Sequence, residues 1–144
     1  MIGNFAVKCG IEYERAVFRH VDTSVGKGLF PGVTTGARVF GHSRAYYGID
    51  GTRIYPDITI ENYVDADKEC FNLIVIECKW CRSANVRKGQ YYEFISRLAQ
   101  FGYKVKGVMV TNCGYSSKTR ESAARMGVSL ALYEPGGEWK WIVL

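Results

Sequence analysis

The clearest pattern along the chain is an alternation of apolar and polar residues over Tyr55–Tyr63, which predicts a half-buried β-strand. Ile58 and Ile60 should face one side of a sheet, and the polar residues beside them, including Asp57, should face the other. The next segment, Phe71–Trp80, is apolar on both faces and predicts a central strand covered from both sides. The short polar turn between the two segments predicts that these strands pair antiparallel.

Helical periodicity is present in three segments, over about 4–22, 85–101 and 117–126. In the first segment, the inward face includes Glu14 together with Val17 and Phe18. In the second, the inward stripe consists of Tyr91, Phe94, Ile95 and Leu98. Residues 22–36 are rich in glycine and predict a loop.

The remaining strands are predicted at Ala37–Phe40, Arg44–Tyr47, Lys104–Thr111, Val128–Tyr133 and Trp139–Val143. The resulting order is helix, β-meander, helix, strand, helix, strand. It predicts an α/β fold with a central mixed β-sheet flanked by helices. Because the 144 residues contain no repeat and no proline-rich linker, we expect one domain over 1–144.

The charge balance favours a polyanionic partner, since 19 Lys and Arg against 14 Asp and Glu give a net charge of +5. No apolar run approaches the ~20 residues of a membrane-spanning helix. The N-terminus also lacks the layout of a signal peptide. An intracellular protein, cytoplasmic or associated with the nucleoid, is therefore expected.

The five cysteines are an odd number, which argues against a complete disulfide framework. Cys78 and Cys81 form a C-x-x-C pair, the one spacing that suggests zinc. Cys78 lies within an apolar strand, however, and no second pair has ligand spacing. We therefore favour the interpretation that the pair has no zinc role.

Two charged residues, Glu77 and Lys79, stand at the end of the most apolar predicted strand. Residues two apart on a strand share a face, so these side chains should project together. Such a pair has an ordinary structural interpretation as an ion pair at a solvated strand end.

Asp57 makes a functional interpretation more attractive. Its strand should pair with that of Glu77, and the preceding Pro56 suits a bulge or edge where a side chain is redirected. Two carboxylates and an ammonium group could then meet at one end of the hairpin. Carboxylate oxygens are the ligands that Mg²⁺ prefers, and such an ion can activate water against a phosphodiester.

Pro56-Asp57, followed twenty residues later by Glu77-x-Lys79, resembles the PD-(D/E)xK nuclease superfamily. Residues 10–14, G-I-E-Y-E, are similar to the G-x-x-[FY]-E element of that superfamily. Gln90 with Phe94 resembles its Q-x-x-x-Y element, with Phe in place of Tyr. Residues 107–132 resemble the last part of Mrr-like restriction endonucleases, and a Holliday-junction-resolvase-like branch is equally compatible.

The resemblance implies a restriction-endonuclease-like fold with an αβββαβ core. It implies that Asp57 and Glu77 bind Mg²⁺, for which Mn²⁺ could substitute, with the backbone carbonyl of Cys78 as a further ligand. Glu14 would support the metal, directly or through water. Lys79 would act on the attacking water, and Gln90 would support the site. Many enzymes of this superfamily are homodimers, so a homodimer is expected.

Several of these residues also have ordinary structural interpretations. Glu14 could be a paired core glutamate, although its inward position distinguishes it from Glu12 on the solvent side. Gln90 could be a polar residue in the first turn of a helix. The structural interpretation is favoured for three further polar residues near the hairpin, namely His42, Asp50 and Glu61.

Phosphate contacts are expected from basic residues near the predicted active end. The candidates are Arg82, Arg87, Lys88, Lys27, Arg44 and Arg53. The predicted function is that of a Mg²⁺-dependent DNA endonuclease of restriction, homing or junction-resolving type. Two alternatives remain open: a non-catalytic DNA-binding or assembly module that keeps the fold, and an unrelated α/β protein whose E-x-K is a structural ion pair.

Overall fold

The structure, a computed structural model, describes residues 9–63, 71–82 and 84–144. The helices are α1 (Gly10–Gly26), α2 (Lys88–Ala99) and α3 (Ser117–Met126). The strands are β1 (Arg38–Phe40), β2 (Tyr46–Tyr47), β3 (Arg53–Ile54), β4 (Ile58–Tyr63), β5 (Phe71–Lys79), β6 (Val105–Thr111), β7 (Ser129–Tyr133) and β8 (Trp139–Val143).

Six of these strands form one mixed sheet in the order β1-β4-β5-β6-β7-β8, and β2 pairs with β3 in a separate two-stranded sheet. β4 and β5 are antiparallel, as predicted, with Ile58 opposite Ile76 and Tyr63 opposite Phe71. β5, β6 and β7 run parallel to one another, and β8 closes the edge antiparallel to β7. The predicted mixed α/β architecture is confirmed.

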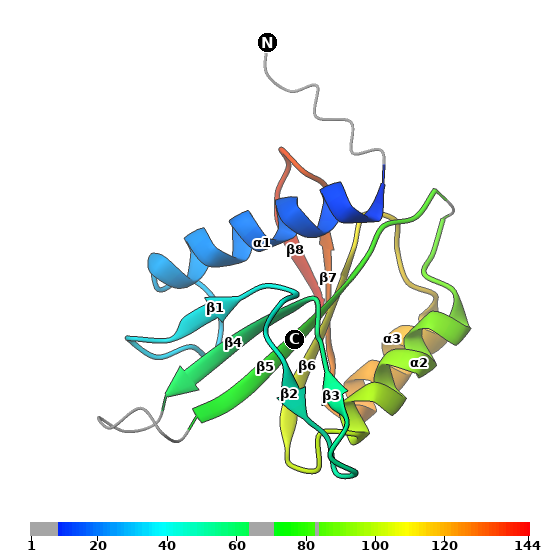
Figure 1. Cartoon of the computed structure of the whole chain (residues 1–144). Helices are drawn as coiled ribbons and strands as arrows, with labels where there is room; N and C mark the ends of the chain where they lie inside the picture. Colours follow the sequence, from blue (N-terminus) through cyan, green and yellow to red (C-terminus); the bar gives the residue numbers. More distant parts are fainter. Residues whose placement is uncertain (1–8, 64–70, 83) are drawn as a thin grey trace.

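The helices cover the two faces of the large sheet in separate layers (Figure 1). On one face, Tyr13 and Val17 of α1 pack with Ile58, Ile60 and residues of the parallel strands. On the opposite face, Tyr91 and Phe94 of α2 pack with Leu73, Val75 and Ala123 of α3. β5 is apolar on both faces because it lies between these two clusters.

The extent of α1 differs from the sequence prediction at its C-terminal end. The helix continues to Gly26, so the predicted loop over residues 22–36 begins later than expected. Val21 is fully buried and Val25 packs against the same cluster, so the apolar stripe continues at i, i+4 spacing beyond Asp22. Residues 4–8 of the predicted helix lie outside the described residues.

The other predicted helices and strands are present, and several are shorter than predicted: α2 spans Lys88–Ala99 rather than 85–101, and β4 begins at Ile58 rather than at Tyr55. β3 was not predicted. α3 and β8 have the predicted bounds, and Gly127, which ends α3, adopts the left-handed conformation with φ of 73°. The chain turns after Tyr47, where the Gly51 N–H donates to the Gly48 carbonyl. Among the described residues, no helix combines the length and apolar character needed to span a bilayer.

Candidate metal centre

The end of the β4–β5 pair brings two carboxylates into neighbouring positions. The antiparallel register ends with Ile58 opposite Ile76, and Asp57 and Glu77 are the next residues along the two chain segments. Asp57 itself lies just before β4, after the buried Pro56. The backbone N–H of Cys78 donates a hydrogen bond of 2.9 Å to Oδ2 of Asp57. The main chain of the E-x-K strand therefore fixes the orientation of the Asp57 carboxylate.

Asp57 does not follow the predicted alternation of β4. The prediction put its side chain on the face opposite Ile58, but the two residues line the same cavity, beside α1. The reason is that Asp57 precedes the regular strand, next to Pro56, where strand alternation does not determine side-chain direction.

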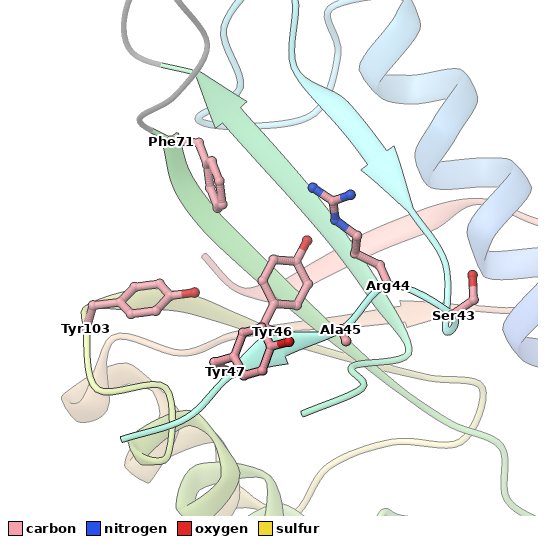
Figure 2. A pocket seen from close by; sticks show the side chains of 7 residues that line it. All are labelled: Ser43, Arg44, Ala45, Tyr46, Tyr47, Phe71 and Tyr103. Atoms are coloured by element: carbon pink, nitrogen blue, oxygen red, sulfur yellow. The ribbon is translucent and has the colours of Figure 1, made fainter. Parts of the chain in front are cut away.

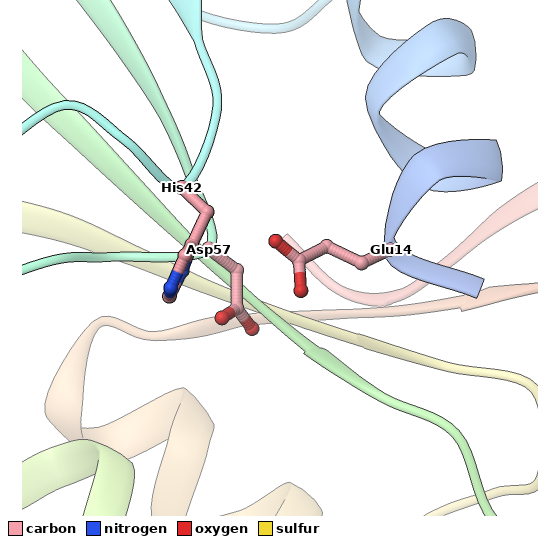
Figure 3. A group of neighbouring side chains, drawn as sticks. All are labelled: Glu14, His42 and Asp57. Atoms are coloured by element: carbon pink, nitrogen blue, oxygen red, sulfur yellow. The ribbon is translucent and has the colours of Figure 1, made fainter. Parts of the chain in front are cut away.

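Three potential metal ligands meet in this cavity. Glu14 extends from α1, His42 comes from the segment after β1, and Asp57 from the start of β4; their side chains point toward one another (Figure 3). Each offers a ligand atom, and these atoms all lie within 4.8 Å of one another. Glu14 and Asp57 are half-buried and His42 is exposed, so the group is anchored at one end and open to solvent at the other.

The cavity has a volume of about 500 Å³ and combines this polar group with apolar walls. Ile11, Phe18 and Ile58 provide apolar surface, and Arg15 adds a cation at the margin. Arg15 and Glu14 are consecutive on α1, so the helix brings a positive and a negative side chain to one opening. Such an arrangement suits a phosphate beside a metal ion.

The carboxylates of the site destabilise one another's charge. Burial, together with the nearby charges of Glu77 and Glu14, raises the pKa of Asp57 to about 6, against the lowering effects of the Cys78 N–H and Lys79. Burial also raises the pKa of Glu14, which the neighbouring His42 lowers. A group of partly buried acids whose negative charges are unfavourable in the absence of a cation is typical of a site that binds one.

Glu77 contacts cations on the α2 side of the sheet. Its side chain is 4% exposed; Oε2 lies 2.9 Å from Nζ of Lys79, and Oε1 lies 2.8 Å from Arg97 of α2. Both carboxylate oxygens are therefore paired with cations. The predicted proximity of Glu77 and Lys79 is present. The predicted metal pair of Asp57 and Glu77 is not found, because Asp57 faces α1 and Glu77 faces α2; the metal-ligand group among the described residues consists of Glu14, His42 and Asp57.

Two further predicted residues have structural contacts. Gln90 Oε1 accepts the backbone N–H of Arg87 at 3.1 Å, which caps the start of α2, as in its alternative interpretation. Asp50 accepts hydrogen bonds from the backbone and side chain of Thr52 in an exposed turn, so its favoured structural interpretation agrees with the contacts.

Glu61 lies in a buried hydrogen-bonded network rather than at the candidate centre. It is fully buried and accepts two hydrogen bonds from Arg44, at 3.0 and 3.1 Å. The hydroxyls of Tyr46 and Tyr63 donate to it at 2.6 and 2.5 Å. This agrees with the structural interpretation of Glu61. Arg44 was predicted to contact DNA, and in the structure its guanidinium forms an ion pair with Glu61.

The cysteines are arranged differently from a zinc site. Cys81 and Cys113 form a disulfide, with their Cα atoms 6.1 Å apart, so Cys81 is not available to pair with Cys78 on a metal. Cys78 and Cys9 are free thiols, and Cys70 lies outside the described residues. Burial raises the pKa of the Cys78 thiol well above its usual value.

The other predicted DNA-contacting residues are exposed, as contact requires. Arg82, Arg87 and Lys88 follow β5, and the guanidinium of Arg82 lies 5.1 Å from the ring centroid of Trp80. Arg53 is exposed on β3, and Lys27 is exposed at the end of α1. Exposure is compatible with the prediction and does not test it.

Sequence reasoning missed His42 and Arg97 as contacts of the site. His42 lies in an irregular segment, where no periodicity indicates the direction of a side chain. Arg97 falls three residues after the core residue Phe94 and four after Glu93, with which it also forms an ion pair. Helical spacing from the inward stripe would have placed Arg97 near β5.

The comparisons with known proteins extend only to the fold. No protein-family model matches the chain, and a search of curated proteins finds no significant match. Among solved structures, the fold is similar to the crystal structure of AF1548, described as a protein of unknown function, with a TM-score of 0.58 and 14% identity. The similarity covers 83% of this chain and 57% of that one, so this chain spans little more than half of its neighbour's length. At this identity the likeness concerns the mixed α/β fold alone.

Proposed function

We propose that this protein is a divalent-metal-dependent DNA endonuclease with a restriction-endonuclease-like fold. The observation that carries the proposal is the meeting of Glu14, His42 and Asp57, in which Asp57 interacts electrostatically with Glu77 and Lys79. The hydrogen bond from Cys78 to Asp57 joins the two groups. If the separate β2–β3 sheet is left out, α1, β1, β4, β5, α2 and β6 follow one another in αβββαβ order. This order and the G-x-x-Y-E and PD…ExK resemblances support the same assignment.

The donor set fits a divalent cation. Ligands of Mg²⁺ lie at 2.0–2.1 Å, so two ligand atoms are about 3 Å apart when adjacent and about 4.2 Å apart when opposite. The three atoms, which lie within 4.8 Å of one another, would therefore move closer together on binding one ion. Two carboxylates and an imidazole suit Mn²⁺ better than Mg²⁺, because imidazole prefers transition metals. Both ions are proposed as cofactors, with Mn²⁺ bound more tightly.

The roles of the residues follow from their positions. A bound divalent ion would hold the scissile phosphate and lower the pKa of an attacking water. Lys79, held by Glu77, would orient that water or stabilise the negative charge of the pentacovalent transition state. Arg15 at the margin of the cavity would contact the phosphate. Arg97 would keep the Glu77 carboxylate in place through its 2.8 Å contact.

DNA is the proposed partner because the chain carries a net charge of +5 and exposes Arg82, Arg87 and Lys88 next to the E-x-K strand. A homodimer would supply two such sites for the two strands of a duplex. Restriction, homing and junction-resolving enzymes all remain within this proposal.

The proposal is tested by a cleavage panel of supercoiled, linear, single-stranded and four-way-junction DNA with Mg²⁺ or Mn²⁺. We expect nicking by the wild type, none by Asp57→Ala, and a loss of at least ~100-fold with Lys79→Ala, which should still bind DNA. Glu14→Gln should also lose activity, whereas Glu12→Gln, an exposed residue of the same helix, is the matched control and should cleave normally. Absence of cleavage of every DNA form with every divalent ion would refute the proposal.

One observation favours a second candidate, a DNA-binding module without catalysis. Both oxygens of Glu77 are paired with cations, which leaves fewer acidic ligands for an ion than the PD-(D/E)xK resemblance implies. The same panel decides between the two: DNA binding that persists in a wild-type protein without any cleavage would support the module.

A further inference from the structure

A second pocket lies beside the small β2–β3 sheet, with a volume of about 620 Å³ (Figure 2). Four of its lining residues are aromatic, and the remainder includes one arginine. These residues are Ser43, Arg44, Ala45, Tyr46, Tyr47, Phe71 and Tyr103. None belongs to the candidate metal centre.

Two of the tyrosines that line the pocket are exposed. Tyr47 is 62% exposed and Tyr103 is 48% exposed. Ile49, in the turn between β2 and β3, is 75% exposed. Exposed apolar side chains that gather around a pocket are typical of a binding surface.

A backbone hydrogen bond links the segment that carries Tyr47 to the segment that carries Tyr103. The N–H of Ile49 donates to the carbonyl of Gln100 at 2.9 Å, which attaches the β2–β3 turn to the segment before β6. Two glycines permit this approach. A Cβ on Gly48 would lie 2.8 Å from the Gln100 carbonyl oxygen, and one on Gly102, where φ is +73°, would lie 2.7 Å from Ile49. The aromatic surface is therefore preorganised.

Positive charge accompanies these rings. Arg53 is opposite Tyr47 in the β2–β3 pair and is exposed. Its guanidinium also interacts with the side chains of Tyr55 and Tyr47, which raises the pKa of Arg53. Lys104 is exposed next to Tyr103. Aromatic faces flanked by cations match the chemistry of unpaired nucleotides, whose bases stack and whose phosphates are negative.

Two stretches of chain connect this surface to the candidate metal centre. His42 belongs to the centre, and the next residues, from Ser43 to Tyr47, line the pocket. From Arg53 the chain returns through Tyr55 to Asp57, and the ring of Tyr55, 46% exposed, has its centroid 6.5 Å from that of His42. The aromatic surface and the metal centre are therefore joined by two short stretches of chain, one at Ser43 and one at Tyr55.

We propose that the surface formed by Tyr47, Tyr103 and Arg53 binds an unpaired strand of DNA and leads it to the candidate metal centre. This inference rests on the proposed nuclease function and refines its substrate class to DNA with a single-stranded segment, such as a flap, overhang or opened junction. In this arrangement the DNA bases stack on Tyr47 and Tyr103. Arg53 contacts the phosphate backbone of the DNA on its way from these tyrosines toward Tyr55.

The test is the binding of fluorescently labelled DNA in EDTA, where no cleavage occurs, followed by anisotropy. The probes are a blunt duplex and the same duplex with an unpaired arm. We expect the wild type to bind the armed duplex at least ~5-fold more tightly, because stacking of one base contributes that much or more. Tyr47→Ala and Tyr103→Ala should each remove most of this preference, and Tyr47→Phe should keep it.

Tyr92→Ala is the matched control, since Tyr92 is an α2 tyrosine of similar exposure, 47%, that does not line the pocket. Equal affinity for the two probes would overturn the inference, as would an equal loss with Tyr92→Ala. The inference would also be overturned if the wild type were a dimer in gel filtration and Tyr47→Ala a monomer, because the surface would then bind a second copy of the chain. Cleavage with Mn²⁺ is measured in parallel: binding without cleavage would refute the nuclease function alone, and cleavage without arm preference would refute this inference alone.

Discussion

The backbone N–H of Cys78 donates a 2.9 Å hydrogen bond to the carboxylate of Asp57. Through this bond the central strand β5 orients an acid of the neighbouring strand without using a side chain. The same acid is partly buried beside Glu77 and Glu14, whose charges raise the pKa of Asp57 to about 6 together with burial. The fold thus holds a carboxylate in a position where its negative charge is unfavourable. A bound cation would compensate that charge, as expected for a metal site.

We predict that Asp57→Asn stabilises the metal-free protein at neutral pH. The pKa of Asp57 is raised from 3.8 to about 6, so folding favours the protonated form, and the stability of the wild type falls as pH rises from about 4 through 6. Asn still accepts the Cys78 N–H but carries no charge. The free energy of unfolding should therefore be about 1–3 kcal/mol higher for the variant at pH 8 and similar for the two proteins near pH 4.

Urea unfolding followed at pH 4, 6 and 8 in EDTA measures this difference. Addition of millimolar Mn²⁺ should reverse it, because only the wild type gains stability from the ion. A variant that is less stable than the wild type at pH 8 in EDTA would show that the Asp57 charge is favourable in the fold, against our account of the site.

We next predict that His42 determines the preference of the centre for Mn²⁺ over Mg²⁺. Its imidazole lies with the two carboxylates, and nitrogen ligands favour transition metals. His42→Gln should weaken Mn²⁺ binding by at least ~10-fold and change Mg²⁺ binding much less. The measurement is the shift of Tm with increasing metal concentration. The control is His20→Gln, because His20 stacks on Trp139 away from the group and its loss should leave both titrations unchanged. If His42→Gln weakened the binding of Mn²⁺ and of Mg²⁺ equally, the imidazole would not be the source of the Mn²⁺ preference.

Most of the fold could be predicted because its elements have strong local patterns. α3 is bounded by the Ser116 cap and by Gly127, and β5 by a continuous apolar run, so their positions depend on nearby residues only. The end of α1 was predicted four residues too early because Val25, which is partly buried, packs against a cluster that includes residues of distant strands. The pairing of Tyr46 with Ile54 in a separate sheet likewise depends on packing that two-residue strands do not encode.

The candidate site could be predicted only in part, for a related reason. Asp57, Glu77 and Lys79 lie in or next to strands, where register relates them to one another. His42 lies in an irregular segment, and its position depends on how β1 and β2 are connected. The predicted side of Asp57 was wrong because alternation holds only within a regular strand, and Asp57 precedes β4. Irregular segments at strand ends are thus both the least predictable and the most important parts of this site.

Glu61 provides a test that separates structural acids from those of the centre. It is fully buried and accepts hydrogen bonds from Arg44, Tyr46 and Tyr63. Glu61→Gln should destabilise the protein by about 2–4 kcal/mol, because it leaves charged and hydroxyl donors poorly satisfied. The Mn²⁺-induced increase in Tm should remain that of the wild type. If the metal response is lost in a variant that is still folded by circular dichroism, Glu61 takes part in metal binding.

The Cys81–Cys113 disulfide should stabilise the fold. It joins the segments that follow β5 and β6, and it closes a loop with a sequence separation of 32. Because the cross-link restricts the unfolded chain, a loop of this size predicts a gain of about 2–4 kcal/mol, and we expect Cys113→Ser to lose that amount. Two hydrogen bonds should keep the same segments together in the folded variant: the N–H of Cys81 donates to the Asn112 side chain, and that side chain donates to the Cys81 carbonyl, both at 2.9 Å. Denaturant unfolding with and without dithiothreitol measures the effect: reductant should destabilise the wild type and the control Cys9→Ser equally, and should leave Cys113→Ser unchanged. A wild type that is insensitive to reductant would show that the two thiols are not joined in solution.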